Sequence, residues 1–288
     1  MKPYLKWAGG KARQADTIRS KFRGRARLYV EPFLGAGAVF FARAAADEFD
    51  HAIIADVNPR LMACHRAVRD DVEGVIDQLR GLPEERDPEA YYEIRHNFNL
   101  VSVGDWYNNP YVETLAAAFI WLNRACFNGL YRENADGDFN VPIGKGRFTL
   151  PDPDHLRACS KLLQRAELLC CDFQLALEGA AIGEGVQVYA DPPYAPVSST
   201  ASFTSYSKGG FDYLDQVALE TTLHVLSMRG AQVVASNSDT ETTRTLYVGW
   251  NLEVVKERRN INSKGTGRGP VGELLLSRIP ATAAVEAA

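Results

Sequence analysis

The sequence of 288 residues lacks several features that would assign it to a common class of protein. Its five cysteines form no Cys-x-x-Cys pair and are odd in number, which argues against a zinc site or a disulfide framework and favours reduced thiols. No apolar run is long enough to span a bilayer, and residues 1–13 contain no apolar core of a signal peptide. We therefore expect a cytoplasmic protein without membrane contact. Internal repeats are also absent, and the one biased segment is the Ala-rich tail 281–288, which we expect to be disordered.

An overall excess of basic residues is missing too, because the net charge is −4. The charge is unevenly distributed, however. Residues 1–27 carry nine Lys and Arg residues against Asp16 alone, and a second basic cluster comprises Lys256, Arg258, Arg259, Lys264 and Arg268. Two such clusters predict a surface that faces phosphate groups, with an ordinary solvated face as an equal alternative.

The most informative stretch is the apolar run 186–190, which is followed at once by Asp191-Pro192-Pro193-Tyr194. The run predicts a buried strand, and the prolines end it because proline has a fixed φ and no N–H to donate. The carboxyl end of this strand, where open α/β sheets bind ligands, then carries a carboxylate, a carbonyl and an aromatic ring. The two acceptors would each hold one N–H of the exocyclic amine of a nucleobase and free its lone pair for attack, while the ring stacks on the base. A rigid turn with a solvated aspartate is the alternative.

A strand, a glycine turn and a helix near the N-terminus outline a nucleotide-type loop. The strand 28–31 precedes Gly35-Ala36-Gly37, but the third glycine of G-x-G-x-x-G and the Lys-Ser/Thr of a P-loop are missing. The next strand, 52–56, ends in Asp56, the usual place for an acid that holds ribose hydroxyls. Glu31 would repel a pyrophosphate and suit a ligand with an amino group. The combination favours S-adenosylmethionine over a nicotinamide dinucleotide; a tight turn whose glycines serve packing is the alternative.

The middle of the chain has a helical pattern without strand signals. Asn58-Pro59 is a strong helix start, with Asn as the cap and Pro at the first position, and helical spacing continues to about residue 125. We therefore expect a helical insertion between two halves of an α/β sheet.

Turn residues after the helices predict a β-hairpin. Residues 130–134 and 138–142 would be its strands, around a turn at 135–137. Arg132 and Asn134 on this hairpin would read bases in a groove, since Arg pairs with guanine and Asn with adenine. A surface hairpin without function is an equal alternative.

The second half of the chain again alternates strands with helices. The strand 168–171 leads into Asp172-Phe173, a candidate contact for an adenine ring. The Ser/Thr/Gly-rich segment 195–211 is a candidate lid because it is a long loop beside a site. We also expect a linker over 147–153, helices over 154–163 and 215–228, a strand over 231–236, and an antiparallel pair of strands over 252–256 and 273–279.

Five motifs occur in a fixed order: K-W-A-G-G-K (6–11), E-P-F-L-G-A-G (31–37), A-D-V-N (55–58), L-N-R…F-N-G-L-Y-R…F-N-V-P (122–142) and D-P-P-Y-A-P…T-A-S-F-T-S-Y (191–206). In these motifs the chain resembles the Dam (DNA adenine methylase) group of N6-adenine methyltransferases, of the DPPY class with the alpha order of motifs. The resemblance covers residues 3–280. It implies an α/β fold, with a Rossmann-like S-adenosylmethionine-dependent methyltransferase sheet and an inserted helical and β-hairpin target-recognition domain. The implied substrate is the adenine of GATC in double-stranded DNA. The implied division is 1–57 and 147–280 for the catalytic domain, 58–146 for the target-recognition domain and 281–288 for the tail.

The resemblance also implies roles for individual residues. Asp191, Pro192 and Tyr194 would be catalytic and hold a flipped adenine, while Leu130, Arg132 and Pro142 read the site and Lys6 contacts a flanking base. The residues expected to bind S-adenosylmethionine are Trp7, Lys11, Glu31, Phe33, Gly35, Gly37, Asp56, Asn58, Asp172, Phe173 and Asp191. Those expected to bind DNA are Lys6, Arg124, Phe127, Asn128, Leu130, Arg132, Asn134, Pro142, Ser199 and Tyr206.

Two positions depart from the family pattern. Phe127 stands where many members have Tyr, which keeps an intercalating ring but removes a hydroxyl contact. Ala125-Cys126 replaces a common His-Gly pair. Both departures affect the expected preference for flanking bases more than the core site.

Two other functions remain open for this sequence. One is an RNA or protein N-methyltransferase with a similar proline loop, and the other is a DNA-binding regulator that keeps the fold without activity. The intact D-P-P-Y and glycine loop argue against the regulator. For the DNA enzyme we expect no metal, because the leaving group is a neutral thioether, and a monomer that acts on the bacterial nucleoid or, if phage-encoded, in the host cytoplasm.

Overall fold

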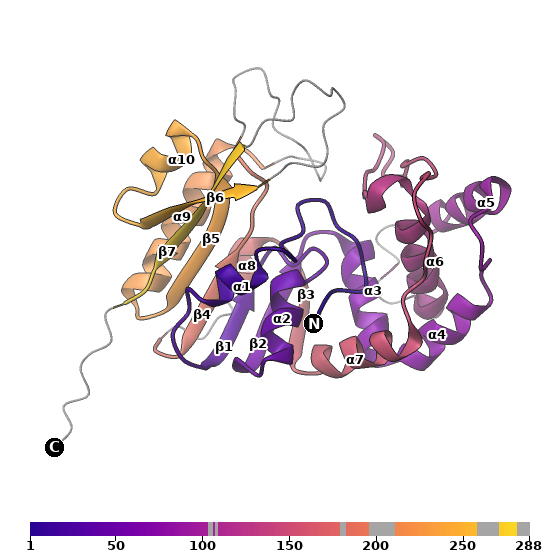
Figure 1. The fold of residues 1–288 in the computed structure, drawn as a ribbon, viewed down its shortest axis with the longest axis horizontal. Helices are drawn as coiled ribbons and strands as arrows, with labels where there is room; N and C mark the ends of the chain where they lie inside the picture. The colour runs from indigo at the N-terminus through magenta and orange to yellow at the C-terminus, as the bar shows by residue number, and fades with distance from the viewer. Residues whose placement is uncertain (103–105, 107–108, 179–182, 196–210, 258–270, 281–288) are drawn as a thin grey trace.

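The computed structural model describes residues 1–102, 106, 109–178, 183–195, 211–257 and 271–280. Figure 1 shows a sheet with helices on both faces and a further group of helices beyond one edge. The expected lid lies outside the described residues except for its two ends, as do Ser199, Tyr206, the tail and most of the second basic cluster. Within the described part of the chain, no helix is long and apolar enough to cross a membrane.

One seven-stranded sheet organises the described chain, in the order β3-β2-β1-β4-β5-β7-β6. The strands are β1 (Ala26–Glu31), β2 (Phe49–Asp56), β3 (Ala166–Cys170), β4 (Val186–Ala190), β5 (Gln232–Ser238), β6 (Asn251–Glu257) and β7 (Val271–Arg278). The first five are parallel, whereas β7 is antiparallel to both β5 and β6. The predicted Rossmann-like α/β sheet and its terminal antiparallel pair are confirmed. The strand order reverses between β1 and β4, and such switch points are where α/β sheets bind ligands.

Helices cover both faces of the sheet. They are α1 (Ala15–Arg19), α2 (Ala38–Ala45), α3 (Pro59–Asp70), α4 (Val72–Arg80), α5 (Pro88–Asn99), α6 (Val112–Ala125), α7 (Pro153–Leu163), α8 (Phe173–Glu178), α9 (Tyr213–Met228) and α10 (Glu241–Leu246), with a 3-10 turn η2 (Phe127–Gly129). Alternate side chains of a strand point to opposite faces. Tyr29 of β1 therefore packs in one core with residues of α2 and α3, while Leu28 and Val30 pack in a second core with residues of α8 and α9. Burial on both faces explains the continuous apolar run Leu28 to Val30 in β1.

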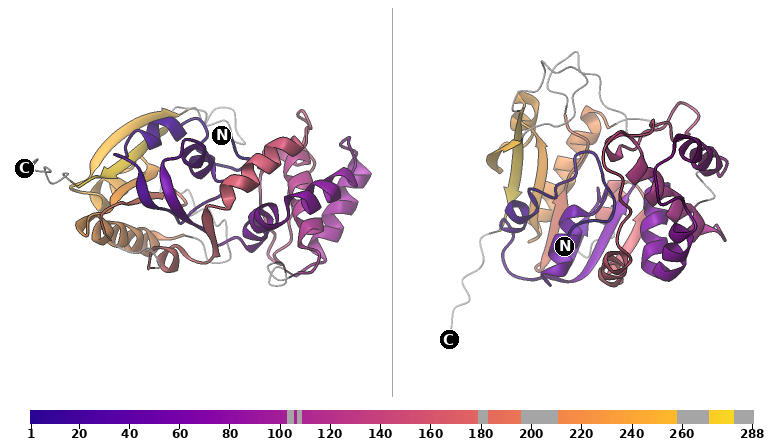
Figure 2. Two further views of the ribbon diagram at one scale, coloured as in Figure 1. Left: turned by 90° about the horizontal axis from the view of Figure 1, so that it is seen from below. Right: turned by 45° about the vertical axis from the view of Figure 1, so that its right-hand side comes forward.

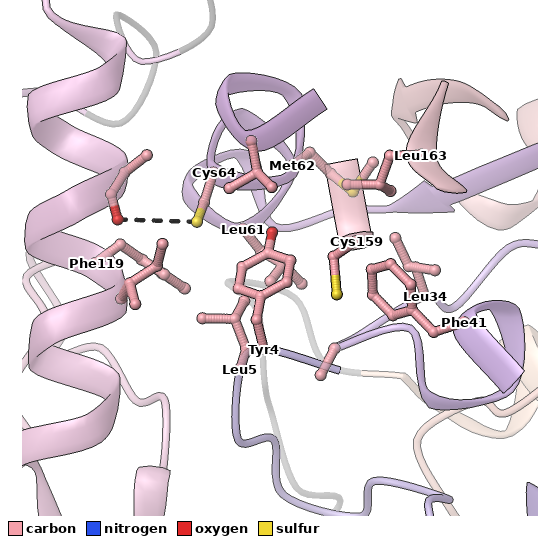
Figure 3. Close-up of a cluster of buried hydrophobic side chains, with 14 of the residues drawn as sticks. Tyr4, Leu5, Leu34, Phe41, Leu61, Met62, Cys64, Phe119, Cys159 and Leu163 are labelled. Atoms are coloured by element: carbon pink, nitrogen blue, oxygen red, sulfur yellow. Dashed lines mark hydrogen bonds between the residues drawn. The ribbon is translucent and has the colours of Figure 1, made fainter. Parts of the chain in front are cut away.

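The helices α4, α5 and α6 lie at the opposite end of the molecule from β6 and β7, beyond the β3 edge (Figure 2). They share a core with the sheet rather than forming a separate one. Figure 3 shows Tyr4 and Leu5 of the N-terminal segment among side chains of α3, α6 and α7, and the Sγ of Cys64 on α3 reaches the carbonyl of Ala116 on α6 at 3.9 Å. The helix α3 contacts β2 and β3 of the sheet as well as α6. The division of the chain at 57/58 therefore remains a prediction.

The predicted hairpin is present only as an irregular chain reversal. A single bridge joins Glu133 to Phe139, and neither side of the turn forms a strand. The prediction of two paired strands is therefore wrong. The physical reason lies in Asn134, whose side-chain oxygen accepts the N–H groups of both Asp136 and Asp138 at 3.0 and 2.8 Å. This Asx-type turn adds to two backbone bonds, from the Asn134 N–H to the Asp138 carbonyl at 2.9 Å and from the Asn140 N–H to the Arg132 carbonyl at 3.0 Å, so the antiparallel pairing is confined to the residues beside the turn.

Much of the N-terminal basic cluster does not form a free phosphate-facing surface. Three of its members are engaged by carboxylates: Arg19 pairs with Asp16 and Glu48, Lys21 with Glu253, and Arg25 with Asp47 and Asp50. Arg25 directly precedes β1, so it lies at the amino end of the parallel strands. Lys11 is buried, with an exposed fraction of 5%. The prediction fails for these four residues because nearby acids were available to pair with them.

Candidate active site

The chain leaves β4 at the switch point as a braced loop, residues 191–195, which we call the Asp191 loop. Other elements hold its far half. The Gln216 side chain of α9 donates to the Pro193 carbonyl at 2.8 Å, and Ser238 Oγ of β5 donates to the Ala195 carbonyl at 2.6 Å. Asn237 Oδ1 accepts the Ala195 N–H at 3.1 Å. The prolines and these three bonds fix the direction in which Asp191 leaves the sheet.

The Asp191 carboxyl group is half-buried and has an unusual environment. Its Oδ1 lies 3.2 Å from Lys11 Nζ, yet this buried oxygen has no hydrogen-bond donor directed at it among the described residues. Burial raises the pKa of Asp191 to about 6, because desolvation and the charge of Glu273 together outweigh the attraction of Lys11. The carboxyl group is therefore ionised at neutral pH, but it takes up a proton at a higher pH than an ordinary aspartate does.

Lys11 stands between two carboxylates. Its Nζ is 3.2 Å from Asp191 Oδ1 and also 3.2 Å from Glu273 Oε1, and it lies 4.8 Å from the centroid of the Tyr194 ring. Burial alone would lower the pKa of Lys11, but the two carboxylates reverse this effect and raise it. Tyr194 in turn donates its hydroxyl to Glu273. The N-terminal segment, the Asp191 loop and β7 therefore meet in one charged cluster.

The glycine loop after β1 is fixed from three sides at Gly35. Its N–H donates to Asp56 Oδ2 at 3.0 Å, and its carbonyl accepts a hydrogen bond from His65 Nε2 at 2.9 Å. The residue has a φ of +51°, and a Cβ there would lie 2.8 Å from the Trp7 indole. Only glycine satisfies both the left-handed conformation and this close approach. His65 Nδ1 is 2.7 Å from the Tyr4 hydroxyl, so the N-terminal segment and the glycine loop are linked through His65 of α3.

Glu31, at the end of β1, is a buried acid. Its exposed fraction is 2%, and its Oε2 accepts the Tyr29 hydroxyl at 2.6 Å. Burial raises the pKa of Glu31 to about 8, and the hydrogen bond from Tyr29 only partly opposes this effect. An acid of this kind ionises when a cation arrives beside it.

Three aromatic rings pack together near the carboxyl end of β3, next to Asp172. Phe33 stacks on Phe173 at 5.5 Å between centroids and meets Phe211 edge-on at 5.7 Å. Phe33 is half-buried, whereas Phe173 is 3% exposed and belongs to the core. Asp172 is exposed, and its Oδ1 accepts the N–H of Gln174 at 2.9 Å.

Two further residues that are predicted to bind S-adenosylmethionine, Asn58 and Gly37, stabilise the local backbone. Asn58 caps α3, since its side chain accepts the Leu61 N–H at 3.0 Å. Gly37 has a φ of +74° at the start of α2, where a Cβ would lie 3.2 Å from the Phe41 ring.

Loop 127–142, which follows α6, is tied to the N-terminal segment by Asn123. The Asn123 side chain accepts the Lys6 N–H at 2.8 Å and donates to the Lys6 carbonyl at 2.8 Å and to the Gly129 carbonyl at 3.3 Å. Gly129 packs directly on Lys6, because a Cβ there would lie 2.4 Å from Lys6 Cβ. Trp7 stacks on Tyr131 at 5.6 Å between centroids. The same segment therefore touches both the glycine loop and loop 127–142.

Helix side chains hold loop 127–142 from its buried side. The guanidinium of Arg60, whose exposed fraction is 1%, lies 4.8 Å from the Phe98 ring centroid. Four side chains donate to loop carbonyls: Arg60 to Gly137 at 3.2 Å, Tyr91 and Arg95 to Val141 at 2.8 and 3.3 Å, and Asn99 to Phe139 at 3.0 Å.

The structure sorts the predicted DNA-binding residues into two groups. Phe127, Asn128, Arg132 and Pro142 are exposed on loop 127–142, as is Lys6 beside it. Arg132 rests on its neighbour, with Nε donating to the Asn140 side chain at 2.7 Å. These side chains are open to a partner.

The remaining predicted contacts have structural partners. Arg124 donates to the Tyr4 carbonyl at 2.7 Å, and its buried Nε has no hydrogen-bond partner in the described part of the chain. Asn134 closes the turn, and Leu130 is half-buried against the core. Arg124 and Leu130 are therefore partly buried, whereas Asn134 is exposed but its side-chain oxygen is occupied by the turn.

Several residues of this site could not be located from sequence patterns. They are Gln14, Arg60, His65, Asn123, Gln216 and Glu273, and their partners are far away in the chain. One signal was present, since Asn123 follows the apolar run 115–122 and Glu273 directly precedes three leucines. Buried polar residues of this kind are uncommon and need partners. No group of three His, Cys, Asp or Glu side chains in the described ranges is placed to hold a metal ion.

Known proteins resemble this chain over nearly its whole length. The model of a family described as D12 class N6 adenine-specific DNA methyltransferase matches residues 7–261. The chain is 39% identical to the type II methyltransferase M.MjaIII of Methanocaldococcus jannaschii, over 93% of this chain and 95% of that protein. It is 35% identical to the DNA adenine methylase of Haemophilus influenzae (95% and 92% covered) and 37% identical to that of Vibrio cholerae (94% and 94%). A solved rRNA methylase from Streptococcus thermophilus covers 93% of this chain and 95% of its own at 9% identity and a TM-score of 0.37, which adds no weight to the assignment.

The sheet order, the position of the Asp191 loop and the family match define this protein as a methyltransferase that acts on adenine in DNA. The chain belongs to the D12 class of N6 adenine-specific DNA methyltransferases, because that family model matches most of its length. The predicted relation to the DNA adenine methylases is confirmed by the relatives of that name.

Proposed function

We propose that this enzyme transfers a methyl group from S-adenosylmethionine to N6 of the adenine in GATC, after rotating that adenine out of double-stranded DNA. The observation that carries the proposal is a pair of available acceptors. Asp191 Oδ1 is buried without a directed donor, and no hydrogen bond among the described residues ends on the Pro192 carbonyl. The next carbonyls in the loop, those of Pro193 and Ala195, are both occupied. Pro192 thus offers an unoccupied carbonyl, and Asp191 offers a carboxylate that is paired with Lys11 at 3.2 Å, which together are the two acceptors that an amine with two N–H groups requires.

The loops after β1, β2 and β3 offer groups that suit S-adenosylmethionine. Glu31 fits the methionyl ammonium, because a buried acid with a pKa of about 8 becomes ionised beside a cation. Asp56 retains lone pairs for ribose hydroxyls after accepting its two backbone N–H groups. Phe33 presents a half-buried ring for the adenine, and Asp172 is exposed nearby. We assign Phe173 the role of supporting Phe33, since its own ring is buried.

S-adenosylmethionine supplies an electrophilic methyl group on a sulfonium. Asp191 and Pro192 each accept one N–H of the N6 amine, which directs its lone pair at the methyl carbon. The N–C bond forms as the C–S bond breaks, and the electron pair of that bond stays on sulfur. Positive charge develops on N6, and the ionised Asp191 stabilises it. One N6 proton then leaves through Asp191, whose pKa of about 6 allows it to pass the proton on to water.

Recognition of DNA is assigned to loop 127–142 and Lys6. Arg132 would exchange its bond to Asn140 for the O6 and N7 of a guanine. Phe127, 45% exposed, would enter the base stack as the adenine leaves, and extrusion costs a few kcal/mol. Both regions come from one chain, so a monomer suffices. Leu130 and Pro142 would also contact the DNA site, as would Ser199 and Tyr206, which lie outside the described residues.

The test uses DNA from cells that lack GATC methylation. The DNA is incubated with purified protein and S-adenosylmethionine, then digested with one nuclease that is blocked by GATC methylation and one that requires it. We expect cutting to pass from the first nuclease to the second, and Asp191→Asn to abolish the change. Radiolabel entering DNA without a change in cutting would keep the adenine chemistry and reject GATC. Label entering RNA instead would favour the RNA enzyme, and no label at all would favour the regulator.

A further inference from the structure

A carboxylate on the antiparallel part of the sheet completes the charge arrangement around Asp191. Glu273 is the one acid of β7, lies opposite Ser238 at the carboxyl end of β5, and is 6% exposed. We propose that Glu273 is a positioning residue for methyl transfer: it holds Lys11 and Tyr194 so that Asp191 keeps an acceptor free for the substrate amine. This inference rests on the proposed function and adds a residue to it.

The contacts of Glu273 use both of its oxygens. Oε1 lies 3.2 Å from Lys11 Nζ and accepts the Tyr194 hydroxyl, while Oε2 accepts Gln14 Nε2 at 2.8 Å. These donors come from the N-terminal segment, the residue before α1 and the Asp191 loop. A buried carboxylate is tolerated only when it is paired and hydrogen-bonded, and Glu273 meets both conditions. An amide has a single acceptor oxygen and could not accept from all three donors in this geometry.

Glu273 also affects the charge around Asp191. Because one ammonium is shared by two carboxylates at equal distances of 3.2 Å, the group of three carries a net charge of −1. If Glu273 were neutral, Lys11 would pair with Asp191 alone. The negative charge that stabilises N6 in the transition state would then be cancelled. Glu273 therefore keeps Lys11 in place while preventing it from neutralising Asp191.

Glu273 also fixes the position of the Tyr194 ring. A tyrosine whose hydroxyl is fixed presents its ring at a fixed angle, and this ring is the proposed stacking face for the adenine. Glu273 thus acts on both sides of the substrate base, through Lys11 on the acceptor and through Tyr194 on the stacking surface.

The electrostatic part of the proposal can be measured because few groups face Asp191. Among the residues that the structure describes, the charged and titratable groups around it are Lys11 of the N-terminal segment, Glu31 of β1, Tyr189 of β4, Tyr194 of the loop and Glu273 of β7. Glu273 and burial raise the pKa of Asp191, whereas Lys11 lowers it. Removing the charge of Glu273 therefore lowers the pKa of Asp191, both directly and through a closer pair with Lys11.

The experiment compares Glu273→Gln and Glu273→Asp with the unmodified enzyme. The pKa of Asp191 is followed by NMR of protein labelled with carboxyl-¹³C aspartate, with Asp191→Asn to assign the signal, and kcat and KM are measured on duplex DNA from pH 5 to 9. We expect Glu273→Gln to lower the pKa of Asp191 and to reduce kcat about a hundredfold, the cost of a small misplacement of reacting groups. KM for S-adenosylmethionine should change little, and Glu273→Asp should restore part of kcat. The matched control is Glu253→Gln, which removes a carboxylate from the neighbouring strand β6 that pairs with Lys21.

Each outcome separates this proposal from the proposed function. An unchanged pKa of Asp191 in a folded Glu273→Gln variant would overturn the proposal, as would an equal loss of kcat in both Glu273 variants without a shift of the pH profile. The NMR titration does not need turnover. If the unmodified enzyme fails to methylate DNA while the pKa still shifts, the proposed function fails and the electrostatic link from Glu273 to Asp191 stands.

Discussion

The Asp191 loop and loop 127–142 are built on opposite principles. The Asp191 loop leaves a central strand, is braced by α9 and β5, and has its charges buried among fixed partners. Loop 127–142 forms no strand, and its outward side chains Phe127, Asn128, Arg132 and Pro142 are exposed. Its bonds to the helices below come from side chains to its backbone. The backbone of this loop is held firmly while its outer side chains are free to exchange partners.

The difference reflects the two tasks. Methyl transfer needs groups already in place, because reorganisation during the reaction costs rate. Recognition needs donors that can give up a weak partner for a base, as Arg132 can give up Asn140. We expect substitutions at the Asp191 loop to change rate and substitutions on the outside of loop 127–142 to change selectivity.

The largest effect is expected for Asp191→Asn. This change keeps the shape and removes the charge, so the methylation rate at saturating substrates should fall about a thousandfold, the upper range for loss of one electrostatic stabiliser. DNA binding, measured by fluorescence anisotropy, should be retained because loop 127–142 is untouched. Near-normal turnover would remove Asp191 from the chemistry, and lost DNA binding would mean that the two regions are not separate.

A smaller effect is expected for Asn123→Ala, which cuts the tie between the two regions. The Lys6 N–H and the carbonyls of Lys6 and Gly129 would lose their partner, and the free energy of unfolding should fall by about 3 kcal/mol. The KM for DNA should rise while S-adenosylmethionine affinity by calorimetry stays the same. Asn251→Ala is the control, since it loses only one long bond, of 3.3 Å, to Ser277. A selective loss of cofactor affinity would contradict the assignment of Asn123 to loop 127–142.

The next effect is expected for Arg132→Ala. Discrimination at one guanine of the site should weaken by about 2 kcal/mol, while methylation of the unaltered site remains detectable. The measurement is kcat/KM on a set of duplexes with one base pair changed at a time. Arg80→Ala on α4, where the arginine pairs with Asp77 on the surface, is the control. An equal loss on every duplex would make Arg132 a phosphate contact.

The smallest effect is expected for Glu31→Gln and appears as a pH dependence. Glu31 keeps its proton up to about pH 8 in the folded protein but loses it near 4.5 when unfolded. The folded state therefore binds more protons between these values, and the stability contributed by Glu31 falls as the pH rises. Relative to the parent, Glu31→Gln should gain about 1 kcal/mol of stability between pH 7 and pH 8 in urea unfolding. A constant difference across that range would show that Glu31 is already ionised.

The sequence predicted what depends on neighbours in the chain. The strands 186–190 and 52–56, the cap Asn58 and the position of Asp191 at a strand end all follow from local patterns, and the structure has them. The family motifs added the order of the two regions. The predicted hairpin is present only as one antiparallel bridge, between Glu133 and Phe139, without the two strands, and the side chain of Asn134 closes its turn, which periodicity does not reveal.

What could not be predicted depends on distant partners. Glu273 meets Gln14 across 259 positions, and Asn123 meets Lys6 across 117. Nothing in either local pattern identifies the other residue. The same holds for the basic N-terminus. Lys21 forms an ion pair with Glu253, so it is not available to the phosphate groups that composition alone predicted as its partners.

The short N-terminal segment has a consequence for the geometry of the reaction. Lys6 is fixed against loop 127–142 by Asn123, and Lys11, five positions later, is fixed between Asp191 and Glu273. The separation between the place where a base sequence is read and the place where a methyl group is received is thus set by the length of a few residues. One residue inserted or deleted between Lys6 and Lys11 would change that separation without altering any residue of either place. The target base would then no longer be aligned with the methyl group that it receives.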